Sequence, residues 1–253
     1  MCFLQLFIHM TGMWPSKRKF ADPFTFTFMQ FTFYGHACFS VVAGGKKILF
    51  DPFITPNPLA KQIDIQQIEA DYILVSHGHG DHLADLIEIA KHTGATVVAA
   101  AEVTGWVAKN GVEKVHPMNF GSYTFDFGRV SFVPAWHSSS MPDGSYGGNP
   151  GGFVLQTAEG NFYYSGDTCL MMDMQLIPHY AKLDFAVLPI GGNYTMDVQD
   201  AVKAMGFIQC TKAIGVHYDT FPVIEIDKEK AKQTFREAGK ELILAGIGET
   251  ITV

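Results

Sequence analysis

One short histidine-rich segment constrains this chain more than any other feature of its sequence. An apolar run at residues 72–75 is followed directly by Ser-His-Gly-His-Gly-Asp-His at residues 76–82. A compact apolar run of this length is typical of a buried strand, which would deliver the polar segment at its carboxyl end. Gly78 and Gly80 free the backbone to turn tightly, so that three imidazoles and one carboxylate can converge.

The side chains of this segment have the character of metal ligands. On a regular strand His77 and His79 would share a face but His82 would not, so a tight loop wrapped around an ion fits the spacing better. Neutral imidazole and ionised carboxylate are ligands for Zn(II), Mn(II), Fe(II) or Ni(II). The alternative is a solvated polar loop that happens to hold several histidines. Rare residues at this density after a buried strand argue against it.

The remaining pattern predicts an α/β protein, because short apolar strands alternate with helical segments from residue 29 onward. Asp197 and Asp227 are suitable N-caps for two of the helices. We expect a single domain, residues 29–253, built as a four-layer αββα sandwich. The expected strands are residues 29–34, 39–42, 47–50, 72–75, 96–100, 123–127, 130–134, 153–157, 162–165, 185–188, 214–216 and 242–244. The expected helices are residues 82–92, 102–110, 197–205 and 227–237.

Composition narrows the classes of protein to which the chain can belong. Its 253 residues, 47% hydrophobic and 17% charged, are those of a globular protein. A net charge of -7 argues against a nucleic-acid partner. No apolar run reaches the ~20 residues of a membrane helix, so no membrane partner is expected either. The cysteines lack CxxC spacing and are interpreted as buried free thiols of a cytoplasmic protein: Cys2, Cys38, Cys169 and Cys210.

The first 28 residues differ from the rest of the chain. A short apolar stretch at residues 1–10 precedes the basic residues 17–19, which reverses the order of a secretory signal. Regular strand patterning begins at Met29. We therefore expect residues 1–28 to be a leader that is peripheral to the fold and to the chemistry.

The heptapeptide resembles the HxHxDH signature of the metallo-β-lactamase superfamily, and further candidate ligands follow in the order typical of that superfamily. His137 follows the strand at 130–134, Asp167 stands in a Gly-Asp-Thr turn, and His217 closes the strand at 214–216. Each would be weak evidence alone, because an isolated histidine or turn aspartate more often has only a structural role. The resemblance spans residues 29–253. It implies a first metal site of His77, His79 and His137, a second of Asp81, His82 and His217, and Asp167 as a bridge.

Four further segments are similar to one branch of the superfamily, the bacterial metal-dependent hydrolases related to ascorbate-6-phosphate lactonase. These segments are residues 33–39, 51–53, 188–196 and 216–218. The resemblance implies two divalent cations, with zinc as the first choice and manganese, nickel or iron as alternatives. It also implies hydrolysis of a small-molecule substrate, an ester, lactone or phosphodiester, by a hydroxide that bridges the two ions. No GxSxG segment offers a serine nucleophile instead.

The catalytic roles beyond metal binding are less determined by the sequence. Asp81 is a ligand that can also orient the attacking water, and His36 or Tyr194 is a candidate proton donor to the leaving group. His36 could equally form a wall of the site, donate a hydrogen bond to a ligand, or pack structurally. Asp51 is expected to accept hydrogen bonds from the ligand loop. The Ser- and Gly-rich loop at residues 138–152 is expected to be flexible and to border the pocket.

Two other functions compete with this hypothesis. One is a phosphodiesterase of the ribonuclease-Z or phospholipase kind that acts on a larger substrate, although the acidic net charge disfavours a nucleic acid. The other is a metal-binding sensor without hydrolytic turnover. True β-lactamase activity is not expected, because no secretory signal is visible. The oligomeric state is left open, a homo-oligomer included.

Overall fold

The computed structural model describes residues 28–253, so the predicted leader falls outside the described residues except for Phe28. Two seven-stranded sheets make up the fold, with strand orders β14-β1-β2-β3-β4-β5-β6 and β13-β12-β11-β10-β9-β8-β7. The first sheet contains β1 (Gln30–Gly35), β2 (Cys38–Ala43), β3 (Lys46–Phe50), β4 (Tyr72–Leu74), β5 (Thr96–Ala100), β6 (Val115–Met118) and β14 (Thr250–Thr252). The second contains β7 (Gly121–Phe125), β8 (Gly128–Pro134), β9 (Gly151–Gln156), β10 (Asn161–Tyr164), β11 (Phe185–Pro189), β12 (Lys212–Val216) and β13 (Glu241–Ile243).

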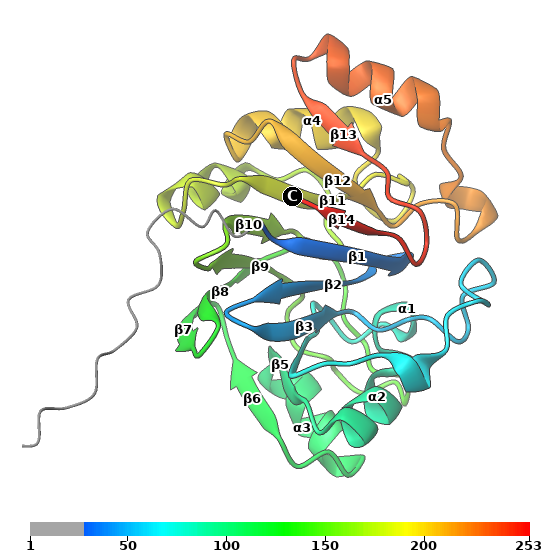
Figure 1. The fold of residues 1–253 in the computed structure, drawn as a ribbon, viewed down its shortest axis with the longest axis vertical. Helices are drawn as coiled ribbons and strands as arrows, with labels where there is room; N and C mark the ends of the chain where they lie inside the picture. The colour runs from blue at the N-terminus through cyan, green and yellow to red at the C-terminus, as the bar shows by residue number, and fades with distance from the viewer. Residues whose placement is uncertain (1–27) are drawn as a thin grey trace, which may run out of the picture.

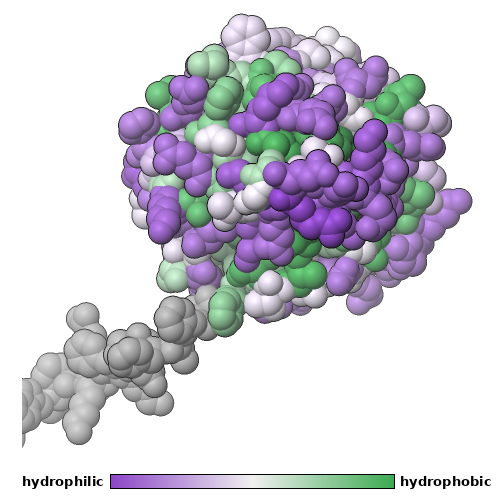
Figure 2. Space-filling view, turned by 90° about the horizontal axis from the view of Figure 1, so that it is seen from above, coloured by the Kyte–Doolittle hydropathy of each residue, from purple (hydrophilic) through white to green (hydrophobic). Residues whose placement is uncertain are grey.

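Helices cover the outer faces of the two sheets (Figure 1). They are α1 (Gly80–Leu83), α2 (Leu86–Thr93), α3 (Ala101–Lys109), α4 (Val198–Phe207) and α5 (Lys228–Glu237), with 3-10 turns η1 (Ile65–Gln67), η2 (Met172–His179) and η3 (Pro222–Ile224). Figure 2 looks down on the side of α4 and α5 and shows mostly polar side chains there, with apolar ones between them. Phe235 of α5 is instead fully buried against its sheet. No helix among the described residues is long and apolar enough to cross a bilayer.

Aromatic side chains fill the space between the sheets. Phe39 and Phe50 of the first sheet stack with ring centroids 4.4 Å apart. Across the interface, Phe50 meets Phe162 at 5.9 Å and Phe39 meets Tyr164 at 5.1 Å, both edge to face. All four rings are completely buried, and edge-to-face packing is a favoured geometry for such pairs. The predicted αββα sandwich is confirmed.

The strand directions bring the functional loops to one edge of the sandwich. Strands β3 to β6 are mutually parallel, as are β10 to β13. The carboxyl ends of neighbouring parallel strands meet at the same edge, where open α/β sheets commonly bind ligands. The histidine-rich loop follows β4, Asp167 follows β10 and His217 follows β12. Residues far apart in the sequence therefore share one surface.

Most predicted elements are present within one or two residues. Both N-caps are confirmed, because the Asp197 and Asp227 carboxylates accept hydrogen bonds from the backbone N–H groups of Asp200 and Lys230. The predicted helix at residues 82–92 is wrong in one respect, because it is interrupted between α1 and α2. At the break the Asp85 carboxylate accepts hydrogen bonds from the backbone N–H groups of Ile54 (2.5 Å) and Thr55 (2.9 Å). Strands β6 and β14 were not predicted. Both are short edge strands, where the apolar pattern is weakest.

Candidate metal centre

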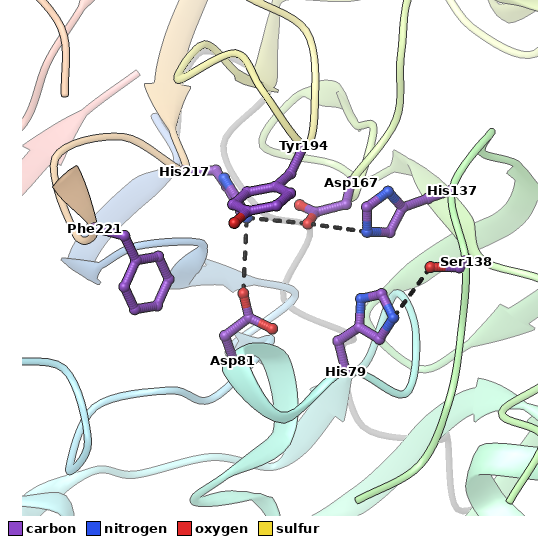
Figure 3. Close-up of a pocket in the computed structure, with 8 residues that line it drawn as sticks. All are labelled: His79, Asp81, His137, Ser138, Asp167, Tyr194, His217 and Phe221. Carbon is purple, nitrogen blue, oxygen red and sulfur yellow. Dashed lines mark hydrogen bonds and ion pairs between the residues drawn. The ribbon is translucent and has the colours of Figure 1, made fainter. Parts of the chain in front are cut away.

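All seven predicted ligands lie in one cluster at this edge of the sandwich. Figure 3 shows His79, Asp81, His137, Asp167 and His217 among them. Nitrogen atoms of His77, His79 and His137 lie within 4.8 Å of one another, which defines a first group. His77 Nε2 is 2.9 Å from His79 Nδ1. Two of these histidines come from the loop after β4, and His137 comes from the segment after β8. The first group therefore joins the two sheets.

A second group contains Asp81, His82 and His217, together with His36, again with ligand atoms within 4.8 Å. Asp81 Oδ2 is 3.9 Å from His217 Nε2 and 4.0 Å from His82 Nε2. Atoms at such separations do not bond directly, but one cation can lie between them. The second group thus has the donor types of a metal site, and Asp81 does not bond directly to His82 or His217.

Asp167 lies between the two groups. Its Oδ2 atom is 3.1 Å from His82 Nε2 and 3.0 Å from His217 Nε2, both in the second group. The same oxygen is 3.7 Å from His137 Nε2 in the first group. One buried carboxylate thus contacts donors on both sides, which is the arrangement that a bridging ligand requires.

Close backbone packing explains two glycines at the site. Gly166, just before Asp167, has φ +60°, and a Cβ there would lie 2.6 Å from the Gly151 carbonyl oxygen. Gly191 begins the loop that carries Tyr194, and a Cβ there would overlap the carbonyl oxygen of His217. Any larger side chain at either position would push a functional loop away from the cluster.

Asp51 accepts hydrogen bonds from the ligand loop, as the sequence predicted. This fully buried carboxylate accepts hydrogen bonds from Ser76 N (2.7 Å), Ser76 Oγ (2.5 Å), His82 Nδ1 (2.8 Å) and Tyr164 Oη (2.5 Å). Since the Ser76 hydroxyl proton goes to Asp51, the Ser76 oxygen accepts from His77 Nδ1 at 2.9 Å. Both Nδ1 atoms therefore donate, and the Nε2 atom of each ring points into the site.

We expect Asp51→Asn to destabilise the metal-free protein by about 3–5 kcal/mol, because an amide cannot replace a buried carboxylate that accepts several donors and pairs with His82. Tyr164→Phe is the matched control, since it removes one donor only and should cost about 1–2 kcal/mol. Urea unfolding of both variants measures the difference. Equal losses would show that Asp51 is no more than another buried polar group.

The pKa shifts at the site divide the candidate ligands into neutral imidazoles and charged carboxylates. Burial lowers the pKa of His77, His79 and His137, so these imidazoles are neutral near pH 7 and can offer lone pairs. Burial also raises the pKa of the Asp167 carboxyl, but the neighbouring imidazoles of His217 and His82 outweigh it and hold that pKa well below its usual value. Asp167 is therefore an anion despite its burial.

His82 behaves differently from the first group. Burial alone would lower its pKa, but the carboxylates of Asp167 and Asp51 on either side of the ring raise it well above the usual value. In the same way, His36 and His82 lower the pKa of the Asp81 carboxyl against the effect of burial. The second group is thus a network of opposite charges.

The cluster fits divalent cations on its own chemistry. Asp167 Oδ1 is buried and has no hydrogen-bond partner among the described residues, and such an atom is costly unless something binds it. Imidazole nitrogens and carboxylate oxygens that face one another across a few ångströms are suitable ligands for first-row divalent metals. The residues present could therefore hold metal ions.

A cavity of about 410 Å³ opens over the cluster. Phe221 and the half-exposed Tyr194 stand at this cavity, as Figure 3 shows, together with the Ser138 hydroxyl. Tyr194 is therefore placed where a candidate proton donor must be. The full lining is His79, Asp81, His137, Ser138, Asp167, Tyr194, His217 and Phe221. The sequence pattern did not point to Phe221, since a lone aromatic residue after a turn carries no local signal.

His36 does not line this cavity. Its side chain is fully buried behind Asp81, with Nε2 3.2 Å from Asp81 Oδ2. Burial, together with the nearby His217, lowers the pKa of its imidazole to about 4. The geometry thus favours a role for His36 as a hydrogen-bond donor to the candidate ligand Asp81. It does not favour the predicted role of His36 as a proton donor to the leaving group.

The loop at residues 138–152 borders the cavity as expected, through Ser138, whereas the expectation for Cys169 is wrong. The segment at residues 138–152 is hydrogen-bonded internally, with Met141 N to Ser145 O at 2.9 Å, and Ser139 Oγ accepts from Gly78 N at 3.0 Å. It therefore buttresses the ligand loop, and only Ser138 reaches the cavity. Cys169 was expected to be buried but is exposed.

Comparisons with known proteins agree with this geometry. A family model described as the beta-lactamase superfamily domain matches residues 46–218. A UPF0173 metal-dependent hydrolase of Flavobacterium johnsoniae is 55% identical over 224 residues, which cover 88% of this chain and 99% of that protein. A second such hydrolase, from Thermus thermophilus, is 42% identical over 84% of this chain and 94% of its own length.

Among solved structures, a metallo hydrolase from the archaeon Ignicoccus hospitalis aligns with a TM-score of 0.81 and 32% identity, covering 90% of this chain and 99% of that one. An isothiocyanate hydrolase from Delia radicum gut bacteria aligns with a TM-score of 0.73 at 16% identity, over 89% and 99% of the two chains, and shows the shared fold alone. The chain therefore belongs to the beta-lactamase superfamily and, within it, to the UPF0173 family of metal-dependent hydrolases.

Proposed function

We propose that this protein is an enzyme that binds two divalent metal ions, zinc first among the candidates, and hydrolyses a small uncharged ester or lactone. The observation that carries the proposal is the Asp167 carboxylate. It contacts histidines of both groups, and one of its oxygens has no hydrogen-bond partner within residues 28–253. When bound, such ions acidify water and polarise the oxygen atoms of a substrate. The ions would be held by His77, His79, His137, Asp81, His82 and His217, with Asp167 shared between them.

Three residues at the cavity can orient the attacking water, donate a proton and offer an apolar surface to the substrate. Ionised Asp81 reaches the cavity from α1, where its carboxylate can accept a hydrogen bond from the attacking water. The Tyr194 phenol stands on the opposite side, as Figure 3 shows, and is the proposed donor of a proton to the leaving oxygen. Phe221 provides an apolar surface for the part of the substrate that does not react.

The cavity favours a small and neutral substrate. None of the lining residues is a lysine or an arginine, the side chains that usually recognise phosphate groups. A space of about 410 Å³ suits a small molecule. A phosphodiesterase acting on a larger, anionic substrate is therefore the less favoured alternative.

The proposal is tested by assaying metal-loaded protein against aryl esters, aliphatic lactones and phosphodiesters, with elemental analysis of the same sample. We expect turnover of esters or lactones and close to two metal equivalents.

Phe221→Ala should raise KM for aryl esters about tenfold, because roughly 1.4 kcal/mol of aromatic contact is lost. The exposed neighbour Val223 (57% exposed) provides the control, Val223→Ala, which should leave KM unchanged.

Two outcomes would contradict the proposal. Preferential cleavage of phosphodiesters would assign the site to the alternative substrate class. Metal uptake without turnover of any ester, lactone or phosphodiester would favour a metal-binding sensor.

A further inference from the structure

His36 makes two side-chain contacts that point in opposite directions. The residue stands in the turn between β1 and β2, and its ring is completely buried. On one side Nε2 is 3.2 Å from Asp81 Oδ2, and on the other Nδ1 is 3.0 Å from Thr220 Oγ1. Thr220 is itself buried, with a relative exposure of 6%. A buried chain of three polar groups thus ends on a proposed metal ligand.

The donors in this chain can be assigned from its chemistry. Asp81 is ionised and can only accept, so the proton between it and His36 belongs to Nε2. A neutral ring then has Nδ1 as an acceptor, and Thr220 must donate its hydroxyl proton there. The competing acceptor for that proton, the Tyr218 carbonyl oxygen, is farther away at 3.4 Å. Thr220 therefore selects the tautomer in which His36 donates to Asp81.

His36 also supports His217, a second member of the same group. The His36 carbonyl oxygen accepts a hydrogen bond from His217 N at 2.7 Å. The two rings lie 4.1 Å apart between centroids. Both residues have positive φ angles, 55° and 56°, which are uncommon for residues other than glycine and persist where the surroundings determine them. The pairing of β1 with β2 also shifts register near Phe33 and Gly35.

We propose that His36, oriented by Thr220, is a positioning residue for the second metal ion and holds Asp81 and His217 in place to bind it. This inference rests on the proposed dinuclear function. Among the described residues, His36 makes no contact with the first group comparable to these. His77 is instead oriented by Ser76, whose hydroxyl donates to Asp51. Occupancy of the second position can therefore be changed separately from that of the first.

The test is metal titration of the whole metal-free protein by calorimetry with Zn(II). His36→Asn keeps a residue that tolerates positive φ and keeps the carbonyl group, but its short amide cannot reach Asp81. We expect the first equivalent to bind as in the wild type and the second to bind about 10–100-fold more weakly. Thr220→Val should weaken the second equivalent in the same direction, and Thr220→Ser should restore it.

A double-mutant cycle separates positioning from direct coordination. The backbone carbonyl that holds His217 is kept in His36→Asn, so the variant tests the ring alone. If that ring acts through Asp81, adding His36→Asn to Asp81→Ala should cost little further affinity at the second position. A full additional loss would mean that the His36 ring binds the metal itself and would overturn the inference. Equal weakening of both equivalents in His36→Asn would overturn it as well, by showing a general structural role.

The same titration distinguishes this inference from the function on which it rests. A wild-type protein that binds no second ion contradicts the dinuclear proposal. A wild-type protein that binds two ions, with His36→Asn binding both equally well, contradicts only the role of His36.

Discussion

Asp167→Asn should abolish hydrolysis while leaving the protein folded. The substitution keeps the shape of the side chain but removes the negative charge that faces His82, His217 and His137. Changing a residue that only supports a metal ligand costs about 10–100-fold in metal affinity or activity. Loss of the shared carboxylate should therefore lower kcat/KM by more than about 100-fold. Steady-state kinetics with elemental analysis of the same preparation measures both effects.

Asp173→Asn is the matched control for this experiment. Asp173 is an exposed aspartate on η2, only six positions further along the chain, and its loss should leave kinetics and metal content unchanged. Wild-type activity and metal content in Asp167→Asn would show that the bridging residue is assigned incorrectly.

Removal of the metal should have the second large effect, on activity and stability together. A ligand that binds only the folded state at about 1,000 times its Kd stabilises it by about 4 kcal/mol. For a domain of this size, that loss lowers Tm by roughly 10 °C. Chelator-treated protein should also lose all turnover. The serine that lines the cavity, Ser138, stands on no GxSxG nucleophile elbow, and the histidine beside it at 3.3 Å, His79, is a proposed metal ligand. Differential scanning calorimetry and the ester assay report the two effects.

Recovery provides the control. Zn(II) or Mn(II) added back in excess should restore both Tm and activity, and chelator saturated with metal beforehand should change neither. Full turnover by protein that elemental analysis shows to be free of metal would contradict the proposed chemistry.

The candidate ligands His77, His79, Asp81 and His82 could be proposed from a local signal in the sequence, whereas His137, Asp167 and His217 followed only from the resemblance to a known family. The glycines between His77, His79 and Asp81 mark a loop in which polar side chains converge. Alternating and continuous apolar runs predicted most strands, since burial of a sheet face imposes that period directly. Asp197 and Asp227 were recognisable as N-caps because capping depends on a carboxylate and a backbone N–H only three residues away.

What only the tertiary structure decided depends on contacts between distant segments. Position along the chain cannot show that His36 lies behind Asp81 instead of in the cavity, because that depends on the packing of Thr220, 184 residues away. Likewise, the break between α1 and α2 arises because Asp85 binds backbone N–H groups of a loop 30 and 31 residues earlier. Spacing and periodicity record only which neighbours along the chain share a face. A buried polar side chain takes whichever partner the completed fold places within about 3 Å, so its role appears only when both sheets are assembled.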